Sequence, residues 1–142
     1  MTQLGKGLVR RWFVEAMNSG SALVAREVSE QVFAVDFIDH DGIDQATCGR
    51  AEWQRAVVDT VFGAFSDVEV TVEKLLTEDD LVAVRYLLQG THTGMFHAIA
   101  PTYRRIRHSE NEIYRIADGR IAESWGEGDW LGTMRQLGAL AT

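Results

Sequence analysis

The spacing of apolar residues changes once along this chain, and that change limits what it can fold into. Up to Phe65, apolar side chains recur every three to four residues, which is the period of an amphipathic helix. After Ser66 they alternate with charged or polar side chains, beginning with Val68, Val70 and Val72, which is the period of a half-buried strand. Helices that precede a run of antiparallel strands are typical of the α+β class.

These two periods, together with turn signals, predict the order of the elements. The expected helices cover residues 8–17, 22–28, 50–65 and 129–137, with Asp129 as the N-cap of the last one. The expected strands cover residues 33–38, 68–76, 81–89, 103–116 and 120–125. We expect a curved antiparallel sheet of three or four long strands with the N-terminal helices on its concave face. A ligand cavity is expected between the two layers.

Length and composition exclude several classes of protein. The 142 residues are enough for one hydrophobic core, so we expect a single domain over residues 1–142. The formal charge of −7 argues against nucleic acid or a membrane surface as a partner, and no apolar run is long enough to span a bilayer. The start of the chain lacks the apolar region of a signal peptide, so a cytoplasmic protein is expected. The single Cys48 and four histidines without ligand spacing argue against a bound metal.

The strand expected over residues 103–116 has no clean apolar face. One of its faces mixes apolar and ionisable side chains: Ile106, His108, Glu110, Glu112, Tyr114 and Ile116. A few polar groups among apolar ones are what a ligand pocket needs, although an exposed strand with solvated carboxylates would have the same pattern. If Glu110 and Glu112 are buried together, repulsion and desolvation raise the pKa of at least one of them, which suits a general acid or base. The alternative is a structural ion pair with Arg50, Arg105 or Arg107.

Other side chains could complete such a pocket. Histidines could assist as proton donors, although each taken alone is equally typical of a turn or a core: His40, His92 and His108. Aromatic residues of the expected helices could form a wall for a flat substrate: Trp12, Phe13, Trp53 and Phe62.

Several segments resemble the SnoaL-like polyketide cyclase family of the NTF2-like superfamily: GTHTG at 90–94, APT at 100–102, EIYRIADGRI at 112–121, ESW at 123–125, Asp129 and MRQLG at 134–138. The resemblance covers nearly the whole chain and implies an α+β cone with an internal pocket. It also implies ring closure of a polyketide by an intramolecular aldol reaction without a cofactor, in which a pocket aspartate moves the proton and pocket histidines assist. Other members of the superfamily are cofactor-independent hydroxylases, dehydratases or isomerases, so the fold does not decide the reaction.

The chain departs from the family pattern at the aspartate itself. In an ungapped match, Gly126 occupies the aspartate position, Ser124 the flanking histidine position and Glu112 that of the histidine on the preceding strand. We therefore expect the acid/base role to have moved to Glu112, Glu110 or Asp129, with His92 and His40 assisting. His108, Tyr114 and Ser124 are expected to bind substrate together with the aromatic wall.

These residues lead to three functional hypotheses. The first is cofactor-independent ring closure of a hydrophobic polyketide, and the second is cofactor-independent hydroxylation of an aromatic polyketide. The third is a module that binds a small molecule without catalysis. We also expect a homodimer through the outer face of the sheet, where the second long strand would present Val82, Val84, Tyr86 and Leu88.

Overall fold

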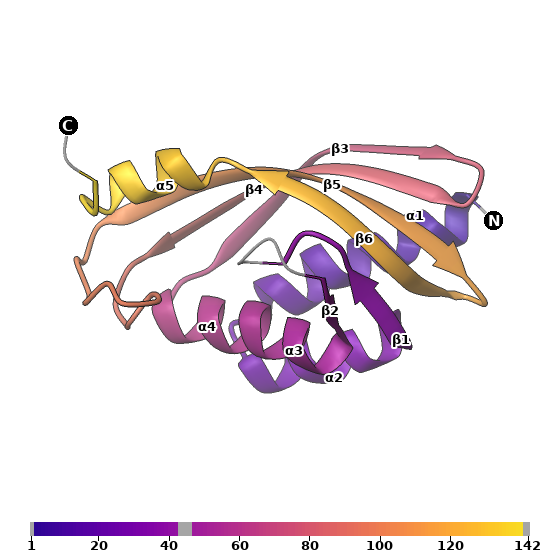
Figure 1. The fold of residues 1–142 in the computed structure, drawn as a ribbon, viewed down its shortest axis with the longest axis horizontal. Coiled ribbons are helices and arrows are strands. Elements are labelled where there is room, and N and C mark those ends of the chain that lie inside the picture. The colour runs from indigo at the N-terminus through magenta and orange to yellow at the C-terminus, as the bar shows by residue number, and fades with distance from the viewer. Residues whose placement is uncertain (1, 43–46, 141–142) are drawn as a thin grey trace.

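The helices of the first half of the chain pack beneath a curved sheet whose long strands come from the second half (Figure 1). The computed structural model describes residues 2–42 and 47–140. Its helical segments are α1 (Thr2–Arg10), the π-helical turn η1 (Arg11–Ala16), η2 (Met17–Ser19), α2 (Ala22–Val32), α3 (Arg50–Gln54), the π-helical turn η3 (Arg55–Asp59), α4 (Thr60–Ala64) and α5 (Trp130–Gln136). Its strands are β1 (Phe33–Asp39), β2 (Cys48–Gly49), β3 (Glu69–Glu78), β4 (Leu81–Thr91), β5 (Arg105–Ala117) and β6 (Arg120–Gly128).

All described strands join one sheet in the order β2-β1-β6-β5-β4-β3. The long strands β3 to β6 are antiparallel neighbours, as predicted. The expectation of a wholly antiparallel sheet is wrong at one place, because β1 pairs with β6 in parallel. No hairpin constrains this pairing, since most of the chain lies between the two strands. The α+β cone is confirmed with four long strands, β3 to β6, within the expected number, and β1 and the two-residue β2 extend the sheet.

An aromatic cluster joins the helices to the first strand. Phe33, at the start of β1, is fully buried. Its ring centroid lies 5.4 Å from that of Trp12 on η1, 4.3 Å from that of Trp53 on α3 and 4.8 Å from that of Phe37. Aromatic rings at these separations add stabilisation to the burial of their surface. This cluster positions the helices against the concave face of the sheet and therefore determines where the cavity lies.

The prediction of which face of β4 points outward is wrong. Val82, Val84, Tyr86 and Leu88 are each at most 8% exposed and belong to the core beneath the sheet. The period of two was read correctly, but the opposite face of β4 also carries apolar side chains, including Leu87. Alternation alone therefore could not tell the inner face from the outer one.

Strand β6 ends at Gly128, and beyond that point helix α5 lies beside β5 in its place. Asp129 caps the helix, since its carboxylate accepts a hydrogen bond of 2.9 Å from the backbone N–H of Gly132. At the other end, the side-chain amide of Gln136 accepts from the N–H of Arg107 at 2.6 Å and donates to its carbonyl at 2.9 Å. The helix therefore covers the free edge of β5 and is held at both ends. Within the described residues, no helix has the length and apolar character needed to cross a bilayer.

Candidate active site

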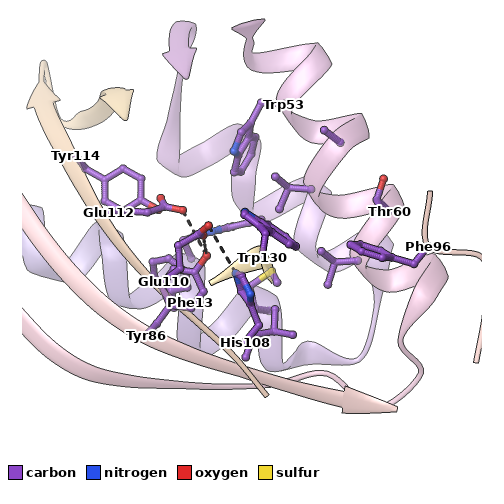
Figure 2. Close-up of a pocket in the computed structure, with 16 residues that line it drawn as sticks. Phe13, Trp53, Thr60, Tyr86, Phe96, His108, Glu110, Glu112, Tyr114 and Trp130 are labelled. Atoms are coloured by element: carbon purple, nitrogen blue, oxygen red, sulfur yellow. Dashed lines mark hydrogen bonds and ion pairs between the residues drawn. The ribbon is translucent and has the colours of Figure 1, made fainter. Parts of the chain in front are cut away.

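A cavity of about 90 Å³ lies between the helices and the concave face of the sheet (Figure 2). Helices supply most of its apolar wall: Trp12, Phe13, Met17, Trp53, Ala56, Val57 and Val61. Two of the contributing segments, η1 and η3, are π-helical turns, a feature that is frequent at functional sites. The remaining lining residues are Thr60, Tyr86, Leu88, Phe96, His108, Glu110, Glu112, Tyr114 and Trp130.

Two carboxyl groups and two phenols meet at one end of this cavity. Glu110 and Glu112 lie on the inner face of β5, and Tyr86 is the cross-strand partner of Glu110 on β4. The hydroxyl of Tyr86 donates to the Glu110 carboxylate and lies 3.4 Å from Oε1 of Glu112. Tyr114, which is itself buried, lies two residues from Glu112 on the same face of β5. The partly buried pair is therefore flanked by two phenols at the end of the cavity.

His108 approaches the same pair from the apolar side. Its Nε2 atom lies 3.7 Å from Oε1 of Glu110, which is an electrostatic contact rather than a direct hydrogen bond. Its Nδ1 atom lies 2.8 Å from the hydroxyl of Thr133 on α5, and this contact orients the ring. Nε2 is buried and has no hydrogen-bond partner among the described residues. It is therefore available to a ligand.

Two glycines on β6 make room for the carboxyl side chains. Gly126 lies opposite Glu112 and Gly128 opposite Glu110 in the ladder between β5 and β6. A Cβ atom on Gly126 would lie 2.8 Å from Cγ of Glu112. On Gly128 it would lie 2.5 Å from Oε1 of Glu110 and 2.8 Å from Nε2 of His108. The carboxyl groups thus occupy the volume that side chains of β6 would otherwise fill.

The environment separates the protonation states of the two carboxyl groups. Burial raises the pKa of Glu112 well above its usual value, and the charge of Glu110 raises it further. Burial also acts to raise the pKa of Glu110, but interactions with His108, Glu112 and Tyr86 outweigh it and lower the pKa. Between the two titrations the pair holds one carboxylate, on Glu110, and one carboxyl group, on Glu112. Burial and these carboxyl groups also raise the pKa of Tyr86 and Tyr114, so both phenols remain protonated.

The alternative of a structural ion pair with arginine is wrong. Arg105 pairs with Asp67 at 3.0 Å on the exposed side of the molecule, and Arg50 donates to the carbonyl of Phe33 at 3.2 Å. Arg107 extends from the outer face of β5, away from the cavity. No lysine or arginine lines the cavity in the part of the chain that the structure describes.

A second, more polar cavity of about 80 Å³ reaches the same carboxyl pair from the side of β1 and β6. Asp39 and Ser124 line it, and the hydroxyl of Ser124 donates to Oδ1 of Asp39 at 3.0 Å. Burial raises the pKa of Asp39, although its hydrogen bonds act in the opposite direction. Ser124, expected to bind substrate, therefore lies at this polar cavity with its hydroxyl already engaged.

The structure brings together most, but not all, of the predicted site residues. Those that line the main cavity are Trp12, Phe13, Trp53, His108, Glu110, Glu112 and Tyr114. Phe62 packs against the core instead, and Asp129 is an exposed helix cap. His40 stacks on Trp125 at 4.9 Å and lies 3.4 Å from the Glu123 carboxylate, outside both cavities.

His92 has a structural position rather than a place in the cavity. It is fully buried, with its ring 5.7 Å from that of Phe65 and 6.5 Å from that of Phe96. Its Nδ1 atom accepts the backbone N–H of Thr102 at 3.1 Å and lies 2.9 Å from the hydroxyl of the same residue. The side chain thus ties the end of β4 to the loop that precedes β5.

Sequence reasoning missed four residues of the site: Tyr86, Trp130, Thr133 and Asp39. The alternation on β4 predicts that Tyr86 shares a face with Val82, Val84 and Leu88, but it does not indicate that this face is the inner one. Trp130 and Thr133 belong to a helix whose contact with β5 arises only in the tertiary structure. No group of three or more potential ligands among residues 2–42 and 47–140 is arranged to hold a metal ion.

The raised pKa of Glu112 predicts how stability depends on pH. The folded protein binds this proton more tightly than the unfolded chain does, so the contribution of Glu112 is fully present below the usual pKa of about 4.5 and is lost as pH rises through the folded pKa. Glu112→Gln removes this loss, so we expect the variant to gain stability relative to the native chain as pH rises. Urea unfolding from pH 4 to pH 9 measures it, with the exposed Glu127→Gln as control. A difference in unfolding free energy that is independent of pH would contradict the raised pKa.

The crowding at β6 predicts that alanine is not tolerated at Gly128. We expect Gly128→Ala to lower the free energy of unfolding by about 1–3 kcal/mol, because the new methyl group displaces Glu110 and His108. Gly7→Ala is the matched control, since that glycine is helical and has open space around it; there alanine should be neutral or slightly stabilising. Equal unfolding curves for Gly128→Ala and the native chain would show that the site does not need the glycine.

Comparison with known proteins agrees with this architecture. A family model described as SnoaL-like polyketide cyclase matches residues 7–137. The aklanonic acid methyl ester cyclase DnrD of Streptomyces peucetius is 31% identical over 134 residues, which cover 92% of this chain and 88% of that protein. The nogalonic acid methyl ester cyclase of Streptomyces nogalater is 33% identical over 84 residues, covering 58% and 62%.

Solved structures share the same fold over nearly the full length. TsrD from Streptomyces laurentii superposes with a TM-score of 0.83 at 25% identity and 97% coverage of each chain. AclR from Streptomyces galilaeus superposes with a TM-score of 0.84 at 23% identity, covering 99% of this chain and all of the other. Together with the family match, these similarities show that the chain belongs to the SnoaL-like polyketide cyclase family.

Proposed function

We propose that this protein closes a ring in a hydrophobic polyketide by cofactor-independent acid/base catalysis at the Glu110–Glu112 pair. The feature that carries the proposal is a pair of carboxyl groups at one end of an apolar cavity, where the surroundings raise the pKa of Glu112 and lower that of Glu110. An aldol ring closure needs both a base and an acid at one place. The apolar walls suit a hydrophobic substrate. Relatives named as cyclases of polyketide esters support the reaction class.

The reaction divides between the two carboxyl groups. The Glu110 carboxylate removes the proton from the carbon next to a substrate carbonyl, and the resulting enolate attacks a second carbonyl carbon to form the ring bond. The Glu112 carboxyl group gives its proton to the alkoxide that forms there. The hydroxyl of Tyr86 contacts both carboxyl groups and donates its hydrogen bond to the Glu110 carboxylate, which stabilises the base in its ionised form. A proton then passes from Glu110 to Glu112, both of which contact the hydroxyl of Tyr86, and the pair returns to its starting state.

The geometry also accounts for the glycine at the family's aspartate position. Glu112 reaches across from β5 into the volume that a side chain at Gly126 would fill. A carboxyl group therefore reaches nearly the same place from the neighbouring strand. We infer that Glu112 has taken over the role that the resemblance assigns to an aspartate at position 126.

The test uses aklanonic acid methyl ester, the compound in the name of the DnrD relative, as a first substrate. Glu112→Gln and Glu110→Gln should each lower kcat by roughly 100-fold or more, because each removes a proton-transfer group. Glu123 lies on β6 and pairs with Arg115 of β5, outside both cavities. Glu123→Gln is therefore the control and should retain activity. The double variant Glu112→Ala with Gly126→Asp should recover part of the rate lost in Glu112→Ala, provided that the carboxyl group can act from either strand. Near-native turnover by Glu112→Gln would remove Glu112 from the mechanism.

The two remaining hypotheses predict different outcomes in the same assay. Ring closure rearranges the substrate without oxidation, so it should proceed at the same rate under nitrogen. A hydroxylase would consume oxygen and stop under nitrogen. A module that only binds would protect the substrate without converting it, and the glutamine variants would then bind as tightly as the native chain.

We also propose a homodimer through the outer face of the sheet, formed by other residues than Val82, Val84, Tyr86 and Leu88. An apolar row crosses four adjacent strands there: Leu76, Ala83, Ile113 and Trp125. Leu76 and Ile113 are 66% and 44% exposed, and exposed apolar rows on a sheet are typical of interfaces. Light scattering at micromolar concentration should give twice the mass of 15.9 kDa, and Ile113→Lys should give the single-chain mass. A native monomer under these conditions would refute the dimer.

A further inference from the structure

Trp130 is one of the residues that line both cavities at the carboxyl pair. It is the first residue of α5, and its indole remains 39% exposed to solvent. Its ring centroid lies 4.2 Å from that of His108 and 6.2 Å from that of Phe96, to which it is nearly parallel (Figure 2). Neither π-stacking partner covers its outer side.

Both cavities share the same inner residues. The apolar cavity beneath the helices and the polar cavity beside Asp39 are each lined by Glu110, Glu112, Trp53, Val57 and Trp130. Of these five side chains only that of Trp130 is exposed to solvent. The carboxyl pair can therefore be approached from both sides. With volumes of about 90 Å³ and 80 Å³, each cavity is well below the roughly 300 Å³ at which pockets for small molecules begin.

The backbone beneath the indole is firmly held, so its side chain is the part that can move. The Asp129 cap and the pairing of Gln136 with β5 hold the two ends of α5. Thr133 adds a hydrogen bond of 2.8 Å to His108 from the same helix. The indole itself is 39% exposed, and exposed side chains change rotamer readily.

We propose that Trp130 determines the size of ligand that this site accepts. In the structure its indole lines both cavities beside the carboxyl pair. When it rotates outward, the cavities join into one site that runs past the carboxyl pair. A flat polycyclic ligand then fits with its rings against the aromatic wall and an oxygenated end near Asp39, whereas a single ring fits without any movement. The ligand class rests on the proposed function, but the size-limiting role of the indole does not.

Equilibrium binding tests this without turnover. We would titrate 1,8-dihydroxyanthraquinone, which has three fused rings, and phenol, which has one, into the native chain, Trp130→Ala and Trp130→Phe. Trp130→Ala should bind the anthraquinone roughly 10-fold more tightly or better, and Trp130→Phe should fall between it and the native chain. Phenol should bind all three within about two-fold. Trp125→Ala is the matched control, because Trp125 also stacks on a histidine but lies on the outer face of the sheet.

The opposite results would overturn the proposal. Anthraquinone binding that is unchanged or weaker in Trp130→Ala would show that the indole is a fixed wall or a stacking surface. An equal gain for phenol would show a general loosening of the site rather than selection by size. If urea unfolding shows that Trp130→Ala does not fold, Trp130→Phe alone tests the proposal. Tighter anthraquinone binding by Trp130→Phe would then support it, and unchanged binding would contradict it. Because no step depends on catalysis, a failure here and an inactive glutamine variant remain separate findings.

Discussion

The placement of Glu110 and Glu112 side by side on the inner face of β5 is the constraint on which the rest of this structure depends. Two carboxylates on one face of a strand repel each other, and burial makes both charges costly. The protein resolves this by keeping one of them protonated, with phenols as donors and His108 as the nearest group that can carry positive charge. The arginines of the chain are engaged elsewhere or lie on the outer surface. A cation beside the pair would favour two carboxylates and remove the acid.

Several features that look unrelated serve this arrangement. The glycines at 126 and 128 leave the volume that the carboxyl groups fill. The aromatic cluster around Phe33 holds the helices over the pair and keeps most water away. Helix α5 supplies the hydroxyl that orients His108 and the indole that lines both cavities. Under the proposed mechanism, the carboxyl group that the resemblance expects at position 126 comes instead from Glu112 on the adjacent strand.

Much of the fold could be predicted from the sequence, because periodicity reports local geometry directly. The change of period after Phe65 indicated the α+β class, and the Asp129 cap was found where its spacing placed it. The parallel pairing of β1 was not predictable, since it joins strands far apart in the chain. The inner face of β4 was assigned wrongly because both of its faces carry apolar residues. For the site, same-face spacing identified Glu110, Glu112 and His108, whereas His92 and His40 were candidates by residue type alone and lie outside the cavities.

By itself, the sequence determined that two glutamates, a histidine and a tyrosine share one face of a long strand, since that follows from a repeat of two residues. It could not determine whether water or helices cover that face. Only the tertiary structure decided that helices cover this face. It also decided that Tyr86 from the next strand and Thr133 from the last helix complete the site, and that Gly126 and Gly128 of β6 leave room for the carboxyl groups. These are contacts between elements distant in the chain, and they depend on packing and register, which local residue preferences do not encode.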